Sequence, residues 1–195
     1  MKTFSATTAL AAWIAACSAL PCFALDPTPG QVRGPFYPNS ALDERDANLA
    51  QVAGRAALGT PLTVRGRVLT RGGAPVAGAQ VELWQADAQG RYHHPADDSP
   101  ATPDPGFQGW GETVTGPQGH YEFRTILPVP YSGRAPHLHF LVRAAGRPEF
   151  VTQMYVAGNA ENEGDFLYSR LSAAERARLT VRPNKGIASF DIVLP

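Results

Sequence analysis

Two histidines stand one residue apart in the stretch YSGRAPHLHF, residues 131–140, although the whole chain contains only five histidines. Successive side chains of a β-strand point to opposite faces, so His137 and His139 would share one face of a strand. At about 3.3 Å per residue, their Cβ atoms would lie roughly 6.5–7 Å apart, from which two imidazoles can bind one metal ion. The pattern alone leaves two interpretations open: a metal site, or two half-exposed histidines on an ordinary strand.

Other ligands for such a metal would have to offer oxygen or imidazole nitrogen. Both cysteines lie in an N-terminal segment that we expect to be removed, so the remaining chain has no thiolate. Tyr92 opens a long loop, and Tyr131 precedes the histidine pair. Each tyrosine could equally be a strand-end or turn aromatic with its hydroxyl in water. His93 and His94 follow Tyr92, but loop histidines beside proline are more often solvated.

The elements that would position these residues are short strands joined by turns, because glycine (19) and proline (18) are abundant. Strand and turn patterns occur at 62–70, 79–90, 112–127, 136–144, 149–158 and 187–194. Only 171–179 has a convincing helical pattern, while 41–54 is expected to be loop with a single helical turn. Residues 93–111 form a long loop, of a length that is more often functional than idle. The sequence predicts an all-β fold, a β-sandwich with long loops and little helix.

The first 24 residues are typical of a secretory signal peptide. A lysine precedes an apolar, alanine-rich run, and small residues at positions 22 and 24 form a cleavage pattern. The run is too short for a membrane span. The sequence IAAC resembles a lipoprotein processing box, so a lipid anchor on Cys17 is a minor alternative to a soluble exported protein in the periplasm or outside the cell. We expect a signal peptide at 1–24, an extended N-terminal arm at 25–60 and a β-sandwich domain at 61–195.

Several motifs occur together in one order: TPGQVRGPFYP, GAPVAGAQVELWQA followed by GRY, GHYEFRT, PYSGRAPHLHF and VTQMYVAG. This series resembles the intradiol ring-cleavage dioxygenases, the family of catechol and protocatechuate 3,4-dioxygenases, over nearly the whole chain after the signal peptide. The resemblance implies a β-sandwich that holds non-haem Fe(III) through two tyrosines and two histidines. Carried over by motif, these ligands would be Tyr92, Tyr131, His137 and His139.

The resemblance also implies a division of roles. Fe(III) is a hard ion that suits phenolate oxygen, and a catechol-type diphenol would displace Tyr131 while Tyr92 stays bound. The displaced phenolate could take a substrate proton. Arg134 would stabilise negative charge on the ring, and Gln153 could orient Arg134, although it could also be a plain strand glutamine. O2 would then open the ring between its hydroxyls to a cis,cis-muconate-type product.

Only Ser132 and Gly133 separate Tyr131 from Arg134, where catechol and protocatechuate enzymes carry a longer insertion, so the identity of the diphenol stays open. The N-terminal helical dimerisation region of catechol enzymes is also missing, and the oligomeric state is open too. A net charge of zero argues against nucleic acid as a partner. Two alternatives come from other classes: a non-catalytic transthyretin-like β-sandwich binding module, and a zinc hydrolase, which the paired tyrosines disfavour.

Overall fold

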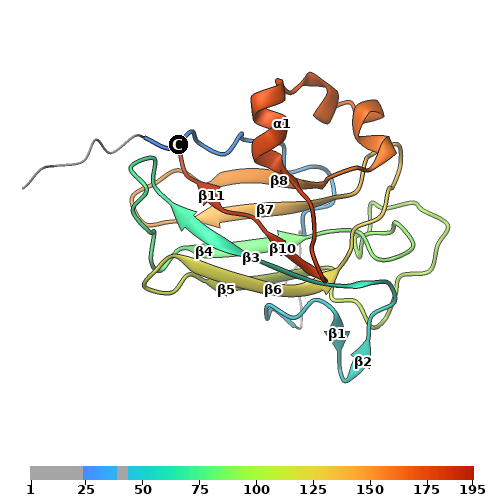
Figure 1. The fold of residues 1–195 in the computed structure, drawn as a ribbon. Coiled ribbons are helices and arrows are strands. Elements are labelled where there is room, and N and C mark those ends of the chain that lie inside the picture. The colour runs from blue at the N-terminus through green and yellow to red at the C-terminus, as the bar shows by residue number, and fades with distance from the viewer. Residues whose placement is uncertain (1–23, 39–43) are drawn as a thin grey trace, which may run out of the picture.

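Two β-sheets pack face to face in the computed structural model, which describes residues 24–38 and 44–195 (Figure 1). Apart from Ala24, the expected signal peptide lies outside the described residues, and so does Cys17. The larger sheet contains, in spatial order, β5 (Trp110–Val114), β4 (Gln80–Trp84), β7 (His137–Arg143), β8 (Phe150–Val156) and β9 (Thr180–Val181). Its neighbouring strands are antiparallel except β8 and β9, which are parallel.

The second sheet is built on the long strand β3 (Pro61–Leu69). On one side, β3 pairs in antiparallel fashion with β6 (His120–Ile126). On the other side, it pairs in parallel with β10 (Ile187–Ser189) and then with β11 (Ile192–Val193). The last predicted strand is therefore two short strands that follow one another along β3.

The break between β10 and β11 has a local steric cause. The Phe190 carbonyl crosses over Gly66 of β3, where an added Cβ would lie 1.8 Å from the carbonyl oxygen. Only glycine permits so close an approach of two backbones. The Tyr121 hydroxyl donates a hydrogen bond to the same carbonyl, which satisfies the acceptor that the strand pairing leaves free.

The hydrophobic core lies between the two sheets and follows from the alternation of apolar residues. Its members from both sheets include Val64, Val68, Tyr121, Phe123, Val81, Leu83, Leu138, Phe140 and Met154. Alternating apolar positions on facing strands produce this two-layer packing. The predicted all-β sandwich is confirmed.

Strand β7 is buried on both of its faces. Leu138, Phe140 and Val142 belong to the core between the sheets, as the alternation predicts. His137 and His139 point to the opposite face, yet each exposes only 2% of its surface. The interpretation as half-exposed strand histidines is wrong, because the N-terminal arm and the loop that begins at Tyr92 cover this outer face.

The helices lie between β8 and β9, in the orange part of Figure 1. They are the 3-10 helices η1 (Ala160–Gly164) and η2 (Tyr168–Arg170) and the α-helix α1 (Ala173–Leu179). Ser172 and Glu175 form a reciprocal capping box at the start of α1, which explains why so short a helix is stable and confirms the predicted one. No helix in the described part of the chain is long and apolar enough to cross a membrane.

The expected helical turn within 41–54 is wrong for the part that the structure describes. The chain instead forms a hairpin of β1 (Gln51–Val52) and β2 (Arg55–Ala56). Its two turn residues, Ala53 and Gly54, have φ values of 47° and 81°. Two successive residues with positive φ match the twist of paired strands, so this turn favours a hairpin over a helix.

Candidate metal centre

The side chains of two tyrosines and two histidines meet on the outer face of the five-stranded sheet. The Nε2 atoms of His137 and His139 are 3.0 Å apart, and the Tyr131 hydroxyl lies 3.5 Å from the Nε2 atom of His137. The rings of Tyr92 and Tyr131 contact each other edge to face, with centroids 5.0 Å apart. The structure therefore brings together Tyr92, Tyr131, His137 and His139, all four residues that the sequence singled out as ligands.

Both histidines are oriented by contacts on the far side of their rings. The Nδ1 atom of His137 lies 2.6 Å from the Ala135 carbonyl oxygen and must carry the proton, which leaves a lone pair on Nε2. The ring of His139 stacks on the indole of Trp84 at 4.8 Å and 11°. Gly34 of the arm lies near the Cε1–Nε2 edge of the same ring, where an added Cβ would sit 3.3 Å from Cε1 and 3.9 Å from Nε2.

Burial also fixes the charge of the two imidazoles. Loss of water, with a smaller contribution from the Arg134 charge, lowers the pKa of His137 to about 3. Burial and the neighbouring His137 hold the pKa of His139 well below its ordinary value. Both rings are therefore neutral at pH 7, the protonation state in which imidazole binds metal ions.

The two tyrosines differ in their surroundings. Burial raises the pKa of Tyr92 well above its ordinary value and raises that of Tyr131 to a smaller extent. The Tyr92 hydroxyl is buried and has no hydrogen-bond partner of good geometry among the described residues. A buried polar group without a partner costs about 1–3 kcal/mol. A bound cation would remove that cost, because it would convert Tyr92 to a coordinated phenolate.

The type of donor restricts the type of cation. Nowhere in the described residues do three or more His, Cys, Asp and Glu side chains gather as they would around zinc or calcium. Two phenol oxygens and two imidazole nitrogens instead suit a hard, highly charged transition-metal ion. The residues present therefore fit the ferric ion that the motifs imply.

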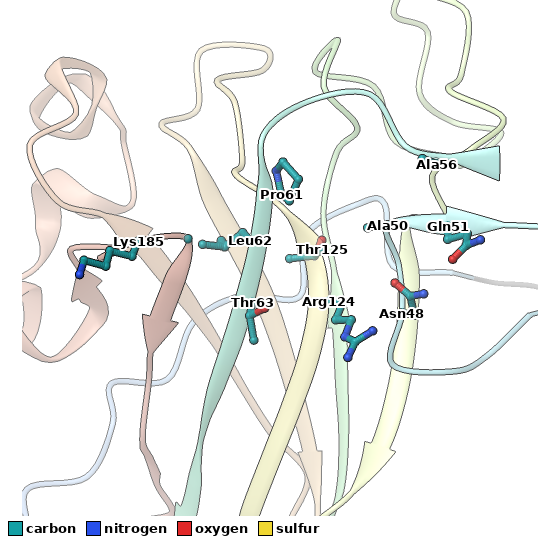
Figure 2. A pocket seen from close by; sticks show the side chains of 11 residues that line it. Asn48, Ala50, Gln51, Ala56, Pro61, Leu62, Thr63, Arg124, Thr125 and Lys185 are labelled. Carbon is teal, nitrogen blue, oxygen red and sulfur yellow. The ribbon is translucent and has the colours of Figure 1, made fainter. Parts of the chain in front are cut away.

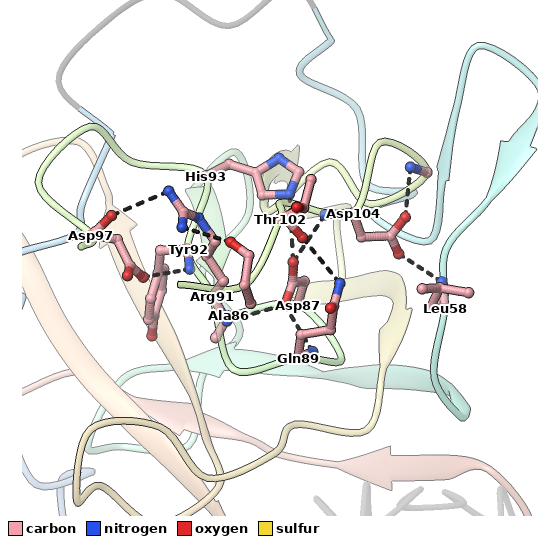
Figure 3. A network of polar contacts seen from close by, with 12 residues as sticks. Leu58, Ala86, Asp87, Gln89, Arg91, Tyr92, His93, Asp97, Thr102 and Asp104 are labelled. Atoms are coloured by element: carbon pink, nitrogen blue, oxygen red, sulfur yellow. Dashed lines mark hydrogen bonds and ion pairs between the residues drawn. The ribbon is translucent and has the colours of Figure 1, made fainter. Parts of the chain in front are cut away.

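Tyr92 is held in place by the loop that follows it (Figure 3). Its backbone N–H donates to the Asp97 carboxylate at 2.7 Å. The Arg91 side chain donates to the backbone carbonyls of Ser99, Ala101 and Asp97. These bonds fold residues 93–101 back onto the end of β4, so the long loop serves as the support of Tyr92.

The two histidines next to Tyr92 do not join the four donors. The ring of His93 packs edge to face on Phe107, and its Nε2 atom lies 4.0 Å from the Asp87 carboxylate. The Nδ1 atom of His94 accepts a hydrogen bond from Ala96 N. Both histidines contact other residues of the loop and its surroundings.

The short Ser132–Gly133 connection is a tight turn that sets the positions of Tyr131 and Arg134. Both residues have positive φ, 42° and 74°. Tyr131 and Arg134 exchange backbone hydrogen bonds across this turn, at 2.7 and 3.3 Å. The turn therefore places the Arg134 side chain next to the Tyr131 side chain. A longer connection between these two residues would not by itself bring them together.

Arg134 is buried, and its guanidinium is the centre of a polar network. Its Nη2 atom donates to Gln153 Oε1 at 2.9 Å and to the Tyr155 hydroxyl at 3.3 Å, and its Nε atom donates to Asp165 Oδ2 at 2.7 Å. Gln153 in turn donates to the Val32 carbonyl of the arm. Asp165 and Tyr155 were not found from sequence, since neither stands in a recognisable motif with Arg134.

A pocket of about 310 Å³ opens beside these residues, lined by Pro130, Tyr131, Ser132, Gly133, Arg134, Glu161 and Gly164. A larger pocket, of about 580 Å³, lies elsewhere (Figure 2). It sits between the β1–β2 hairpin and the β3–β6 pair, with Arg124 and Lys185 at its walls, and none of the four donors lines it. Of these two pockets, only the smaller one reaches a candidate donor, Tyr131.

Comparisons with known proteins agree with this geometry. A family model described as dioxygenase matches residues 32–195. The protocatechuate 3,4-dioxygenase beta chain of Burkholderia cepacia is 37% identical over 178 residues, which span 82% of this chain and 76% of that protein. Hydroxyquinol 1,2-dioxygenase of Nocardioides simplex is 33% identical over 161 residues, or 73% of this chain and 52% of the relative.

Among solved structures, similarity extends to the dioxygenase domain of a dioxygenase carbohydrate-binding protein fusion from Streptomyces sp. SirexAA-E. The two share 33% identity with a TM-score of 0.69, over 87% of this chain and 98% of that domain. The chain thus spans a whole dioxygenase domain but about half the length of the hydroxyquinol relative. These matches leave no place for the non-catalytic binding module considered above: the chain belongs to the intradiol ring-cleavage dioxygenases, a family of oxidoreductases.

Proposed function

We propose that this protein is a non-haem Fe(III) dioxygenase that opens the ring of a catechol-type diphenol between its two hydroxyl groups. One observation carries the proposal: two tyrosines and two histidines, all but Tyr131 buried, come together beside a pocket that also contains an arginine. In the reaction, the bond between the two hydroxyl-bearing carbons breaks. Each new carboxyl group receives one oxygen atom from O2, so a cis,cis-muconate-type product forms without another oxidant.

The iron would be held by Tyr92, Tyr131, His137 and His139. When bound, Fe(III) would bind both oxygens of the diphenol and activate the ring for attack by O2. Both imidazoles are already neutral at pH 7 because burial lowers their pKa values, so iron would not have to displace a proton from either ring. The phenols must lose their protons on iron binding, so iron uptake releases protons and strengthens as the pH rises.

The surroundings of the two tyrosines support different roles. Tyr131 lines the pocket, whereas Tyr92 is 3% exposed and its backbone is held by Asp97. An incoming diphenol therefore meets the Tyr131 oxygen first. We assign the Tyr131 phenolate as the base that takes a proton from the diphenol, and Tyr92 as the ligand that stays in place.

Arg134 is positioned to act on the bound ring. It lines the same pocket as Tyr131, and the tight turn keeps the two side chains adjacent. A fixed positive charge in a buried site stabilises negative charge that develops on a ring carbon. Gln153 contacts Arg134 directly and supports its orientation.

The charges of the pocket favour a neutral diphenol over one that carries a carboxylate. Arg134 is the only cation among the described residues that line the pocket, and Asp165 already opposes its charge. Glu161 adds a negative charge at the same pocket. A carboxylated diphenol would therefore find no free cation, in contrast to the substrate in the name of the protocatechuate relative.

The proposal is tested by loading the purified protein with ferrous salt in air. We expect a visible absorption band from tyrosinate-to-iron charge transfer, and uptake of one O2 for each catechol consumed. The product should be a dicarboxylic acid without an aldehyde group. A protein that stays colourless and metal-free after refolding with iron would overturn the proposal.

We further propose that the protein is exported. The support is the N-terminal sequence alone, with its apolar run and cleavage pattern. Mass spectrometry of the protein from the periplasmic or external fraction should find a chain that begins at Leu25. A lipid-modified Cys17 at the N-terminus would instead indicate an anchored protein.

A further inference from the structure

The two carboxylate oxygens of Asp165 accept hydrogen bonds from two different segments of the chain. Oδ1 accepts hydrogen bonds from Leu167 N and Tyr168 N at 2.9 and 3.0 Å, which closes the turn between η1 and η2. Oδ2 accepts from Arg134 Nε at 2.7 Å and from Ala135 N at 2.9 Å. One oxygen shapes its own loop, and the other reaches a segment 31 residues earlier in the chain.

This carboxylate stays ionised although it is buried. The side chain has 0% exposure. Burial alone would raise the pKa of Asp165, but hydrogen bonds from Tyr168 N, Ala135 N and the Arg134 side chain together hold it below its ordinary value. A buried charge with these partners is rigid, because any movement would leave it or its partners unpaired.

Asp165 and its neighbours occupy all but one edge of the Arg134 guanidinium. Nε is bound by Asp165, and Nη2 is bound by Gln153 and Tyr155. The guanidinium carbon lies 5.2 Å from the centre of the Phe166 ring, which covers one face. Asp165, Gln153 and Tyr155 do not contact Nη1, and the Arg134 side chain lies within reach of the Tyr131 hydroxyl and lines the same pocket.

We infer that Asp165 is a positioning residue that sets the direction of the Arg134 guanidinium, so that its Nη1 edge faces Tyr131 and the diphenol that would displace it. The guanidinium group is planar and rigid. A short charged hydrogen bond that fixes Nε therefore also restrains the direction of Nη1. Gln153 and Tyr155 restrain the guanidinium at Nη2, and the bond from Nε to Asp165 adds a second fixed point. The inference rests on the proposed function, since it assigns Arg134 a substrate to face.

The division of labour within Asp165 allows a selective variant. In Asp165→Asn, the amide oxygen can keep the bonds from Leu167 N and Tyr168 N. The amide NH2 group would then replace Oδ2 and point its hydrogens at the Arg134 and Ala135 donors. The variant therefore disturbs the guanidinium while the loop can keep its hydrogen bonds.

The experiment compares wild type, Asp165→Asn, Arg134→Ala and the double variant, each loaded with iron and assayed with catechol. We expect the charge-transfer band and iron content to persist in all four. Misplacement of a catalytic group by about 1 Å can lower a rate by about 10²-fold, so kcat should fall to that extent in Asp165→Asn. The double variant should be no slower than Arg134→Ala, because the inference assigns the effect of Asp165 on the rate to Arg134 and not to its second contact, Ala135 N.

Asp104→Asn is the matched control. Asp104 is also a buried carboxylate, and its oxygens accept from Leu58 N and Gly106 N and not from any of the four donors (Figure 3). This variant should lose stability as Asp165→Asn does but keep the wild-type kcat. A fall in kcat equal to that of Asp165→Asn would mean that any loss of a buried carboxylate slows the enzyme, and would overturn the inference.

A second readout does not depend on catalysis. In ¹⁵N spectra of the metal-free protein, Arg134 Nε–H should exchange slowly with solvent in wild type and fast in Asp165→Asn. An unchanged Arg134 signal, an unchanged kcat, or a double variant much slower than Arg134→Ala would each overturn the positioning role.

If Asp165→Asn fails to fold, Asp165→Glu keeps the charge but moves it by one methylene, and wild-type kcat there would equally refute the role. A wild type that takes up no iron would refute the proposed function and leave the Nε readout to judge Asp165.

Discussion

At the scale of single residues, the site is defined by polar atoms that the folded chain leaves without partners. The Tyr92 hydroxyl and the Nδ1 atom of His139 are both buried and lack hydrogen-bond partners among the described residues. Native proteins leave few buried polar groups without a partner, and those that remain are often at functional sites, where a bound ligand supplies the partner. The Tyr92 hydroxyl lies among the four candidate donors, so a cation bound there would satisfy it, whereas Nδ1 of His139 is not the ring nitrogen that meets His137.

Tyr92→Phe separates metal binding from folding. Phenylalanine fills the same space in the aromatic cluster of Trp84, Trp110 and Phe36 but has no oxygen. Because the variant removes an unsatisfied buried hydroxyl, the metal-free protein should be as stable as wild type or more stable by about 1 kcal/mol. Iron content after loading should fall to a small fraction of the wild-type value. Urea unfolding of the metal-free proteins and metal analysis test both halves, and equal iron occupancy would contradict the assignment of Tyr92.

The pH dependence of stability should report the lowered pKa of Asp165. A carboxyl group whose pKa is depressed in the folded state stabilises the protein above its unfolded pKa, which is 3.8 here. This contribution is lost as the pH falls through the folded pKa. The gap in unfolding free energy between wild type and Asp165→Asn should therefore be full above about pH 5 and shrink below pH 4. A gap that stays constant from pH 6 to pH 3 would show that the charge of Asp165 does not contribute.

At the scale of elements, the N-terminal arm does more than lead into the domain. Gly34 lies against His139, and Phe36 lies against Tyr92, with ring centroids 4.9 Å apart. The Tyr37 hydroxyl donates to the buried carboxylate of Glu82 at 2.7 Å and so ties the arm to β4. The arm therefore forms one wall of the metal centre, even though its sequence has no regular pattern.

Gly34→Ala and Gly54→Ala form a matched pair that tests this wall. Both glycines have positive φ, 76° and 81°, so alanine should cost about 1–2 kcal/mol of backbone strain at either position. Only at Gly34 would the new methyl group press on His139, since nothing lies within 4 Å at Gly54. Both variants should lose similar stability, whereas only Gly34→Ala should bind iron more weakly. Equal iron affinity in the two would show that the arm does not set the position of His139.

Some features of these elements could be predicted from the sequence, and others could not. Alternation in β7 was enough to predict that His137 and His139 share a face, because a strand has only two faces. It could not predict that this face is buried, since the cover comes from Gly34, more than a hundred positions away. The place of Tyr92 at the start of the long loop made it a candidate, but only the family motif assigned it as a ligand. Asp165 was missed because its contact with Arg134 depends on how the η1–η2 segment folds over β7, and no local pattern encodes that.

At the scale of the whole molecule, overall charge gives little guidance to a substrate. The net charge is zero, so long-range attraction of anions or cations is weak and the local charges of the pocket decide. The pocket beside Tyr131 combines one paired arginine with Glu161.

Glu161→Lys should therefore change which diphenol the protein prefers. The substitution replaces the pocket's unpaired negative charge with a positive one, so kcat/KM for a carboxylated diphenol such as protocatechuate should rise relative to that for catechol. Because Glu161 is exposed, we expect a shift of roughly fivefold that declines as salt is added. Glu163→Lys is the control, since Glu163 belongs to the same short helix but pairs with Arg176 and does not line the pocket. If both variants shift the ratio equally, the general charge of the surface and not the pocket selects the substrate. If neither does, the short Ser132–Gly133 turn and the shape of the pocket must exclude the carboxylate instead.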